Sequence, residues 1–246
     1  MKLSVVIPAY NEEGCIEKVI REISGLLDRE SIPYEIVAVN DSSTDGTAGI
    51  IESLVSGIDG VRAVHRKLPR GFGRAVREGL DNVRGDAVVI AMGDASDDAG
   101  DIVKYYRKLE EGYDCVFGSR FMKESIVRGY PPFKLFVNRI ANTLIRMMFL
   151  LKENDITNAF KAYRREVIEA VKPLVSNQFN ITIEIPLKAV NRGFRFTQIP
   201  INWYGRVSGV SKLKLSELQK KYFFTLIYCW LEKLMLKDEV TKERSS

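Results

Sequence analysis

The sequence has 246 residues, a net charge of +5 and 46% hydrophobic residues. This length fits one large α/β domain or two small ones, and the hydrophobic content supports a full core and argues against extensive disorder. The N-terminus does not resemble a signal peptide, and the longest strongly apolar run, Tyr222 to Leu231, is far shorter than the ~20 residues of a spanning helix. The three cysteines (Cys15, Cys115 and Cys229) lack the spacing of a metal site, which indicates free thiols in a reducing compartment.

The first half of the chain alternates short apolar runs with helical patterns. Strands are predicted at Leu3–Ala9, Glu35–Asn40, Val61–His65, Ala87–Met92 and Asp114–Phe117. Helices are predicted at Glu12–Leu27, Thr44–Val55, Gly73–Val83 and Asp98–Glu110. This order predicts an α/β fold with a mainly parallel sheet and helices on both faces.

Two further helices are predicted in the second half, at Phe133–Lys152 and Leu215–Lys237, and residues 238–246 are expected to be a disordered tail. Both helices combine apolar and aromatic residues with lysine or arginine, which is typical of helices that lie in a membrane interface. Packing on the sheet is the commoner role of an apolar stripe. A partner protein or a second copy of the chain would also cover such faces.

An apolar run that begins at Val88 ends in three carboxylates, Asp94, Asp97 and Asp98. Open α/β sheets bind ligands beyond the carboxyl ends of such strands, and a divalent cation shared with a phosphate would relieve the repulsion between these carboxylates. The same residues are equally suited to cap the next helix, since aspartate is favoured at helix N-termini.

Several other kinds of site are disfavoured. The loop after the first strand has no glycine-rich turn for a dinucleotide, and a phosphate-cradling P-loop is absent. The single histidine, His65, ends a strand, where a structural role is expected. No nucleic-acid-binding module is recognisable.

Three strand ends carry polar loops that belong together: PAYNE at 8–12, NDSSTDGT at 40–47 and MGDASDD at 92–98. In this order they resemble the family 2 inverting glycosyltransferases, and within them the dolichyl-phosphate mannose synthase group. The resemblance implies the GT-A nucleotide-diphospho-sugar transferase fold, in one catalytic domain over residues 1–214. It continues through GSRF at 118–121, DITNAFK at 155–161 and a last motif between residues 200 and 213, so that it covers roughly residues 3–214.

The resemblance also implies roles for residues. It places Asp41 at the nucleotide base and Asp94 at a Mg²⁺ or Mn²⁺ ion. Asp97 or Asp98 is a candidate for a second ligand, with capping of the following helix as the alternative role. Asn40 stands where an aspartate is common, and Met92 stands at the first aspartate of the usual Asp-x-Asp metal motif. The residues implied to bind the nucleotide are Pro8, Ala9, Tyr10, Glu12, Asp41, Gly71, Gly73 and Gly93.

The second half of the chain is basic where the first half is acidic. Residues 1–119 contain 14 Lys/Arg and 21 Asp/Glu, whereas residues 120–152 and 192–221 each contain seven Lys/Arg and one Glu. A phosphate acceptor is already an anionic nucleophile, so it needs cations that hold it in line rather than a general base. We expect Arg120, Arg206 and Lys212 to bind the phosphates.

The resemblance and the charge pattern together predict a metal-dependent enzyme that moves mannose or glucose from a GDP- or UDP-sugar to a polyprenyl or dolichyl phosphate. We expect it at the cytoplasmic face of a membrane, bound peripherally, with a membrane-anchoring partner or a second copy as further candidates. One alternative is transfer to a sugar hydroxyl with Asp97 as general base. The other, motivated by Met92, is a non-catalytic scaffold that binds nucleotide sugars.

Overall fold

The computed structural model describes residues 1–205 and 215–243. Seven strands form one sheet in the order β3-β2-β1-β4-β7-β5-β8, and β6 pairs with β9 in a separate ribbon. The strands of the sheet are β1 (Leu3–Ala9), β2 (Tyr34–Asn40), β3 (Val61–His65), β4 (Ala87–Ile90), β5 (Cys115–Ser119), β7 (Lys161–Arg164) and β8 (Phe196–Pro200). The ribbon joins β6 (Val127–Arg128) to β9 (Trp203–Tyr204).

The sheet is parallel except at β7, which runs antiparallel to both of its neighbours, β4 and β5. All residues of β1 and β4 are buried. Strands covered on both faces read as continuous apolar runs rather than as alternating patterns, which is why these two stood out in the sequence. The predicted α/β fold with a mainly parallel sheet is confirmed.

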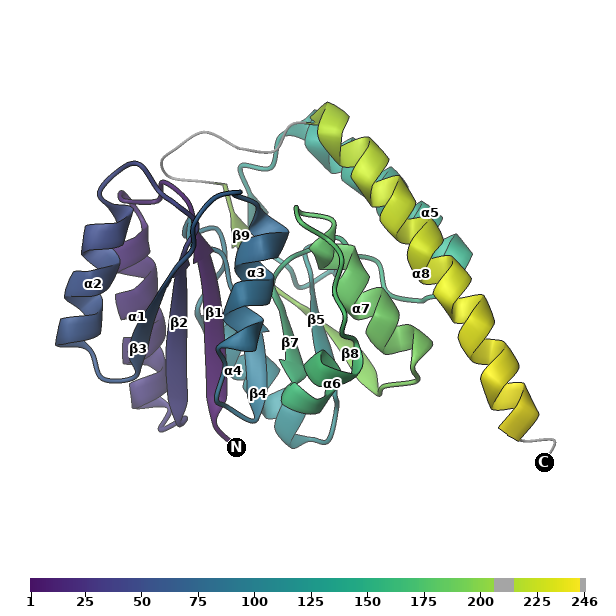
Figure 1. Cartoon of the computed structure of the whole chain (residues 1–246), viewed down its shortest axis with the longest axis horizontal. Coiled ribbons are helices and arrows are strands. Elements are labelled where there is room, and N and C mark those ends of the chain that lie inside the picture. Colours follow the sequence, from purple (N-terminus) through teal and green to yellow (C-terminus); the bar gives the residue numbers. More distant parts are fainter. Residues whose placement is uncertain (206–214, 244–246) are drawn as a thin grey trace.

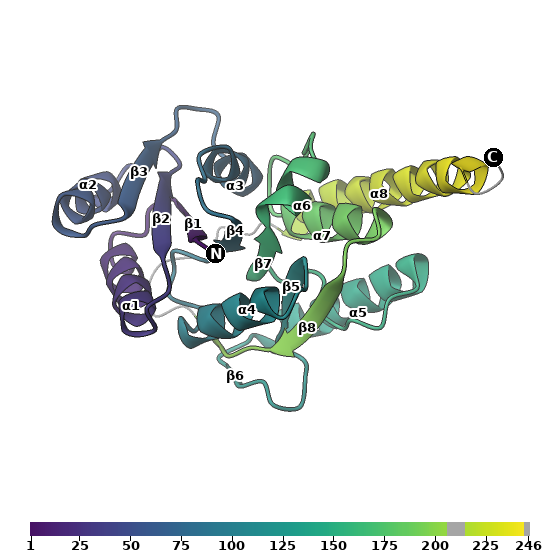
Figure 2. The ribbon, with the colours of Figure 1, turned by 90° about the horizontal axis from the view of Figure 1, so that it is seen from below.

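Helices cover both faces of this sheet (Figure 2). One face carries α1 (Ile16–Arg29), α2 (Thr47–Gly57) and α4 (Gly100–Glu110), and the other carries α3 (Phe72–Asp81), α6 (Arg165–Ala170) and α7 (Ile181–Asn191). Each face closes over its own apolar core. The remaining two helices, α5 (Pro132–Phe149) and α8 (Leu215–Glu243), lie beside each other at the end of the sheet far from β3 (Figure 1).

The ends of the elements differ from the predicted ones in ways that have local causes. Helix α1 begins at Ile16 rather than Glu12, because the backbone at Cys15 (φ −131°, ψ −32°) is not helical. Strand β7 was not predicted, since it has only four residues, KAYR, and two of them are charged. The tail expected to be disordered from Asp238 is helical as far as Glu243.

Candidate active site

The loops after β1, β2 and β4 meet at one edge of the sheet, the upper edge in Figure 1, because these strands are neighbours and run parallel. The Asp41 amide donates to the carbonyl of Ala9 at 2.8 Å. Gly93 lies against the first strand, where a Cβ would stand 3.2 Å from the Pro8 carbonyl oxygen. The three polar motifs therefore form one continuous surface, at the place where open α/β sheets bind ligands.

Asp41 is a buried carboxylate with a donor on each oxygen. The amide of Gly71 donates to Oδ2 at 2.7 Å, and the Arg66 guanidinium pairs with Oδ1. Only 4% of Asp41 is exposed, so its position is fixed from two sides. A carboxylate fixed in this way at a strand end is suited to accept a hydrogen bond from a ligand in a defined direction.

Tyr10 and Arg70 form the outer wall beside Asp41. The Arg70 guanidinium carbon lies 4.7 Å from the centroid of the Tyr10 ring, and Arg70 also donates to the Tyr10 hydroxyl. A cation over an aromatic face is a stabilising pair, and planar groups of this kind stack on nucleotide bases. Neither Arg66 nor Arg70 was predicted from the sequence, although both come soon after the end of β3.

The remaining residues of the first two loops hold the backbone in place. The Glu12 amide donates to the Thr47 hydroxyl at 2.9 Å, and Asn40 is 3.0 Å from His65 Nδ1. His65 Nε2 lies 2.6 Å from Glu52. Both ring nitrogens of His65 therefore have partners, which agrees with the structural role expected for it.

The acidic loop separates its three carboxylates into different environments. Asp98 accepts from the first amide of α4, at Gly100 (2.8 Å), and from the Asn202 side chain (3.0 Å). Asp94 accepts from the Ser96 amide at 3.1 Å. Asp97 accepts from the Met92 amide at 3.0 Å through Oδ2. Asp98 thus caps the helix, whereas Asp94 and Asp97 are held by the loop itself.

Asp97 is the carboxylate with the most perturbed acidity at this edge. Burial raises its pKa to about 7, and the neighbouring charge of Asp94 adds to the effect. Its Oδ1 atom is buried and has no hydrogen-bond donor among the described residues. A buried, unpaired carboxylate oxygen costs free energy unless a cation or a donor satisfies it.

Asp94 and Asp97 together fit a shared divalent cation. A hard cation such as Mg²⁺ binds through one or two carboxylates and takes its other ligands from phosphates and water. Within residues 1–205 and 215–243, no group of three or more His, Cys, Asp or Glu side chains could hold a metal ion by itself. The substrate's phosphates and water would therefore have to complete the coordination.

Arg120 lies beside this loop and is bound by Asp155. Two guanidinium nitrogens donate to the two carboxylate oxygens at 2.8 Å each, and the Arg120 amide donates to the same carboxylate at 3.0 Å. The guanidinium also lies 5.4 Å from the ring centroids of Phe121 and Tyr130. Arg120 was predicted to bind phosphate directly. In the structure, two of its three guanidinium nitrogens already donate hydrogen bonds to Asp155.

Lys161 fixes the loop that carries Asp155. It is fully buried, and its ammonium donates to the carbonyls of Ile156, Asn158 and Thr182. Burial lowers its pKa to about 7. The sequence motif 155–161 therefore has a physical basis: its lysine secures the loop whose aspartate holds Arg120.

Two predicted phosphate ligands, Arg206 and Lys212, lie outside the described residues. Gly71 and Gly73 lie at the start of α3, where a Cβ would clash with the backbone of residues 176–178. Close backbone contact of this kind is a requirement that only glycine meets. These two positions thus need glycine for packing, whatever they bind.

Residues 4–172 match the family model described as Glycosyl transferase family 2. The chain is also 30% identical over 225 residues to a polyprenol monophosphomannose synthase of Mycolicibacterium smegmatis, a match that covers 89% of this chain and 83% of that protein. The chain belongs to glycosyl transferase family 2. It is therefore a glycosyltransferase.

A second relative within this family is a dolichol-phosphate mannosyltransferase of Pyrococcus furiosus, 31% identical over 217 residues. That match covers 87% of the chain, and it spans only 60% of the relative's length. Among solved structures, glucosyl-3-phosphoglycerate synthase of Mycobacterium tuberculosis, crystallised with Mn²⁺, uridine diphosphate and glucosyl-3-phosphoglycerate, has a TM-score of 0.71 at 24% identity. The structural match covers 93% of this chain and 79% of the synthase chain. This likeness confirms the GT-A fold.

Proposed function

We propose that this family 2 glycosyltransferase moves a hexose, with mannose as the first candidate, from a nucleotide-diphosphate sugar to a polyprenyl phosphate. The two relatives are named as a polyprenol monophosphomannose synthase and a dolichol-phosphate mannosyltransferase, and these names support both the acceptor and the sugar. Asp41 with the wall of Tyr10 and Arg70 would take the nucleoside. Asp94 and Asp97 would hold a Mg²⁺ or Mn²⁺ ion at the diphosphate.

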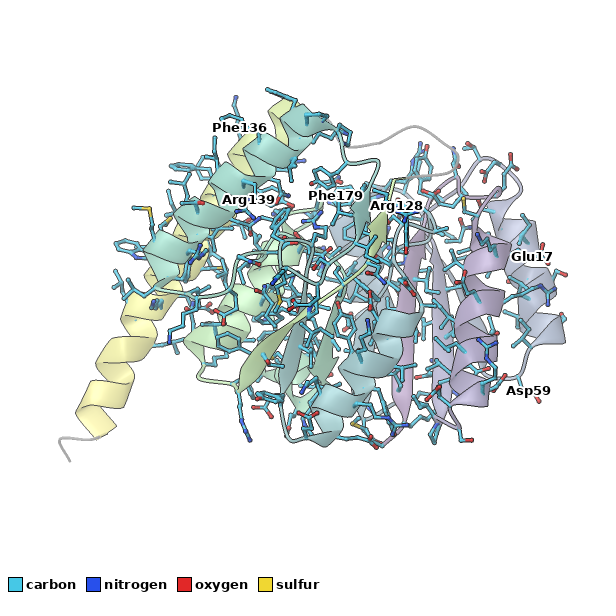
Figure 3. The ribbon with its side chains drawn as sticks, turned by 180° about the vertical axis from the view of Figure 1, so that it is seen from behind. Glu17, Asp59, Arg128, Phe136, Arg139 and Phe179 are labelled. Atoms are coloured by element: carbon cyan, nitrogen blue, oxygen red, sulfur yellow. The ribbon has the colours of Figure 1, made fainter. Side chains whose placement is uncertain are left out.

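The observation that carries the lipid acceptor is the outward apolar face of α5. Five of its apolar residues, spaced three or four apart, are 46–69% exposed: Phe133, Phe136, Ile140, Leu144 and Met147. This spacing places them on one side of the helix. Figure 3 labels Phe136 on α5 together with Arg139, whose guanidinium lies 4.8 Å from the Phe121 ring beside the candidate site.

The inner side of α5 carries two asparagines that contact the candidate site, beside the buried apolar residues Ile145 and Phe149. Asn142 accepts from the Ile156 amide at 2.7 Å and donates to the Thr157 hydroxyl at 3.0 Å. Asn138 donates to the same hydroxyl at 3.0 Å. Residues 156 and 157 follow Asp155 directly. Helix α5 therefore has its exposed apolar residues on one side and, on the other, contacts the loop that carries Asp155, the partner of Arg120.

Helix α8 continues the apolar surface of α5. Its exposed apolar and aromatic residues are Phe223, Phe224, Tyr228, Trp230, Leu231, Leu234 and Met235. Lys220 and Lys221 are exposed beside them. Amphipathic helices of this composition lie in the interface of anionic membranes. In the described part of the chain, no helix is both long and apolar enough to cross a bilayer, so peripheral binding through α5 and α8 is the mode we propose.

The reaction we propose is an in-line displacement at the anomeric carbon. An oxygen of the acceptor phosphate forms the new bond to that carbon, and the bond to the leaving nucleoside diphosphate breaks with inversion. A bound divalent cation would neutralise the charge that develops on the leaving group. The chain's own residues position the two substrates: Asp41 fixes the nucleoside, and Arg120, oriented by Asp155, faces the phosphates.

Transfer to a sugar hydroxyl is a second candidate, because the raised pKa of Asp97 would suit a general base. Radiolabelled GDP-mannose, UDP-glucose and UDP-N-acetylglucosamine, each offered with polyprenyl phosphate or with a soluble glycan, separate the two. We expect labelled lipid product only with polyprenyl phosphate. Product only with the soluble glycan would contradict the proposal, and binding without product would favour a non-catalytic scaffold.

A further inference from the structure

Residues 174–180, between α6 and α7, form a segment that touches both the candidate nucleotide site and α8. On one side the segment lies against the start of α3. A Cβ at Gly73 would be 2.6 Å from the Ser176 carbonyl oxygen and 2.7 Å from that of Gln178. The Phe179 ring stacks on Phe72 with centroids 4.3 Å apart and the planes 5° from parallel.

Arg77 adds a polar link between the segment and α3. Its guanidinium donates to the Leu174 carbonyl at 2.7 Å and to the Asn177 side chain at 2.6 Å. The amide of Gly71, which directly precedes α3, donates to Asp41. A shift of the segment would therefore move the Gly71–Gly73 backbone, and with it one of the two donors that fix Asp41.

The segment is itself held by two buried side chains of the α7 region. Glu184 is fully buried, and its carboxylate oxygens accept from the amides of Val175 and Ser176 at 2.8 Å each. Asn180 accepts from the Gln178 amide at 3.2 Å and donates to the Ser176 hydroxyl at 2.7 Å. These bonds fix the backbone of residues 175–178 from within the protein.

Helix α8 supplies the outer support of the same segment. The Tyr222 hydroxyl donates to the Phe179 carbonyl at 2.9 Å, and the Asn180 side chain donates to the Thr225 hydroxyl at 2.9 Å. One turn further, the Asn191 side chain donates to the Cys229 carbonyl at 2.8 Å. Residues 222, 225 and 229 share one side of the helix, and this side binds α7 and the segment through polar groups.

We infer that Tyr222 and Thr225 are positioning residues for the nucleotide-sugar donor, which they affect through Phe179, Phe72 and Gly71 without touching it. The inference rests on the proposed donor site at Asp41. It gives α8 a role that its apolar face does not imply: the helix that faces the acceptor side also sets the geometry of the donor pocket. Since Asn180 and Thr225 are buried and Tyr222 is half-buried, loss of these hydrogen bonds leaves poorly solvated donors or acceptors that the segment must move to satisfy.

Matched variants at position 225 test this. Thr225→Val keeps the shape of the side chain and removes its hydroxyl, whereas Thr225→Ser keeps the hydroxyl. Tyr222→Phe removes the bond to the Phe179 carbonyl and, with it, the 3.1 Å contact with the Thr182 hydroxyl. We expect Thr225→Val and Tyr222→Phe each to raise the dissociation constant for the nucleoside diphosphate by about threefold to tenfold, and Thr225→Ser to bind as the unmodified protein does.

The measurement is calorimetric titration of the full chain with GDP and with UDP, each in the presence of Mn²⁺, together with steady-state kinetics. A positioning role raises the KM for the donor and leaves kcat at saturating donor and the KM for the acceptor unchanged. Unchanged nucleotide affinity in both variants, with the unmodified protein binding normally, would overturn the inference alone. Failure of the unmodified protein to bind either nucleotide would overturn the proposed function, and the inference with it.

Discussion

Helices α1 and α8 expose opposite kinds of side chain. On α1 the inward residues are almost all apolar, among them Ile16, Ile20 and Leu27, and an exposed Arg21–Glu17 ion pair lies outside. Among the α8 side chains that the structure describes, at 220–236, Thr225 and Cys229 are buried, and the exposed ones include Phe224 and Met235. The first pattern is that of a helix between a core and water.

The second pattern requires something other than water on the outer side. Helix α5 shows it as well, with Asn142 and Ile145 inside and Phe136 among its exposed residues. Exposed apolar patches of this extent mark interaction surfaces. The molecule therefore has two kinds of surface: charged side chains that suit water lie around α1, and apolar side chains that suit an apolar neighbour lie around α5 and α8.

A substitution by glutamate, made once in α1 and once in α8, is the strongest test of this difference between the two surfaces. Ile20→Glu places an unpaired charge where the side chain is fully buried, and we expect it to abolish folding, at a cost of about 4 kcal/mol or more. Phe224→Glu falls at a position that is 68% exposed. It should change the free energy of unfolding by less than about 0.5 kcal/mol.

Thermal unfolding followed by circular dichroism measures the first effect, and flotation with vesicles that contain phosphatidylserine measures a second. Phe224→Glu should float less than the unmodified protein, because a charge replaces an aromatic group that would enter the interface. If Phe224→Glu unfolded as readily as Ile20→Glu, the outer face of α8 would have to be covered within the protein itself.

Asp94→Ala separates catalysis from membrane binding. We expect turnover to fall by about a thousandfold or more, since a cation that stabilises the leaving group contributes several kcal/mol. Flotation should not change, because Asp94 is buried at the sheet edge and not on α5 or α8. Chelation by EDTA should reproduce the loss in the unmodified protein, and Mn²⁺ should restore it. Turnover that survives both treatments would contradict the metal assignment.

The parts of the structure that the sequence predicted well are those fixed by local pattern. Strand β1 is a run of apolar residues between two loops, and a parallel sheet forces the loops after neighbouring strands to one edge. The placement of Asp41 and the acidic loop at the same edge of the sheet therefore followed from strand order. Capping by Asp98 was one of two interpretations, and the bond from the Gly100 amide, which only the structure reveals, favours it.

The parts that were not predicted depend on contacts between distant residues. Nothing in the sequence around Arg66 indicates that it pairs with Asp41, 25 positions earlier. The bidentate bond between Arg120 and Asp155 likewise spans 35 positions. Strand β7 is recognisable only through its pairing with β4 and β5. Such pairings are set by tertiary packing, which a pattern of single residues does not record.

Arg120→Lys tests the Arg120–Asp155 pair, which lies between the sheet-edge loops and α5. Lysine keeps the charge but cannot make the two parallel bonds to Asp155, so the cation would lose its fixed direction. We expect kcat/KM to fall by about tenfold to a hundredfold. Asp155→Asn should give a loss of similar size, and the double variant should lose less than the two single losses combined, because both act on one pair. Full additivity, measured by initial rates on folded proteins, would mean that the pair does not act as a unit.

Asp98→Ala is expected to have the smallest effect. It tests whether Asp98 caps α4 while Asp94 and Asp97 hold the proposed cation. Removing the bond to the Gly100 amide should lower the free energy of unfolding by about 1 kcal/mol, as the loss of a helix cap does, and urea titration measures this. Turnover and its dependence on Mn²⁺ should stay the same, since Asp98 faces the start of α4 and Asn202. A rise in the Mn²⁺ concentration needed for half-maximal turnover would instead make Asp98 a metal ligand, and the separation of one capping carboxylate from two that hold the cation would fail.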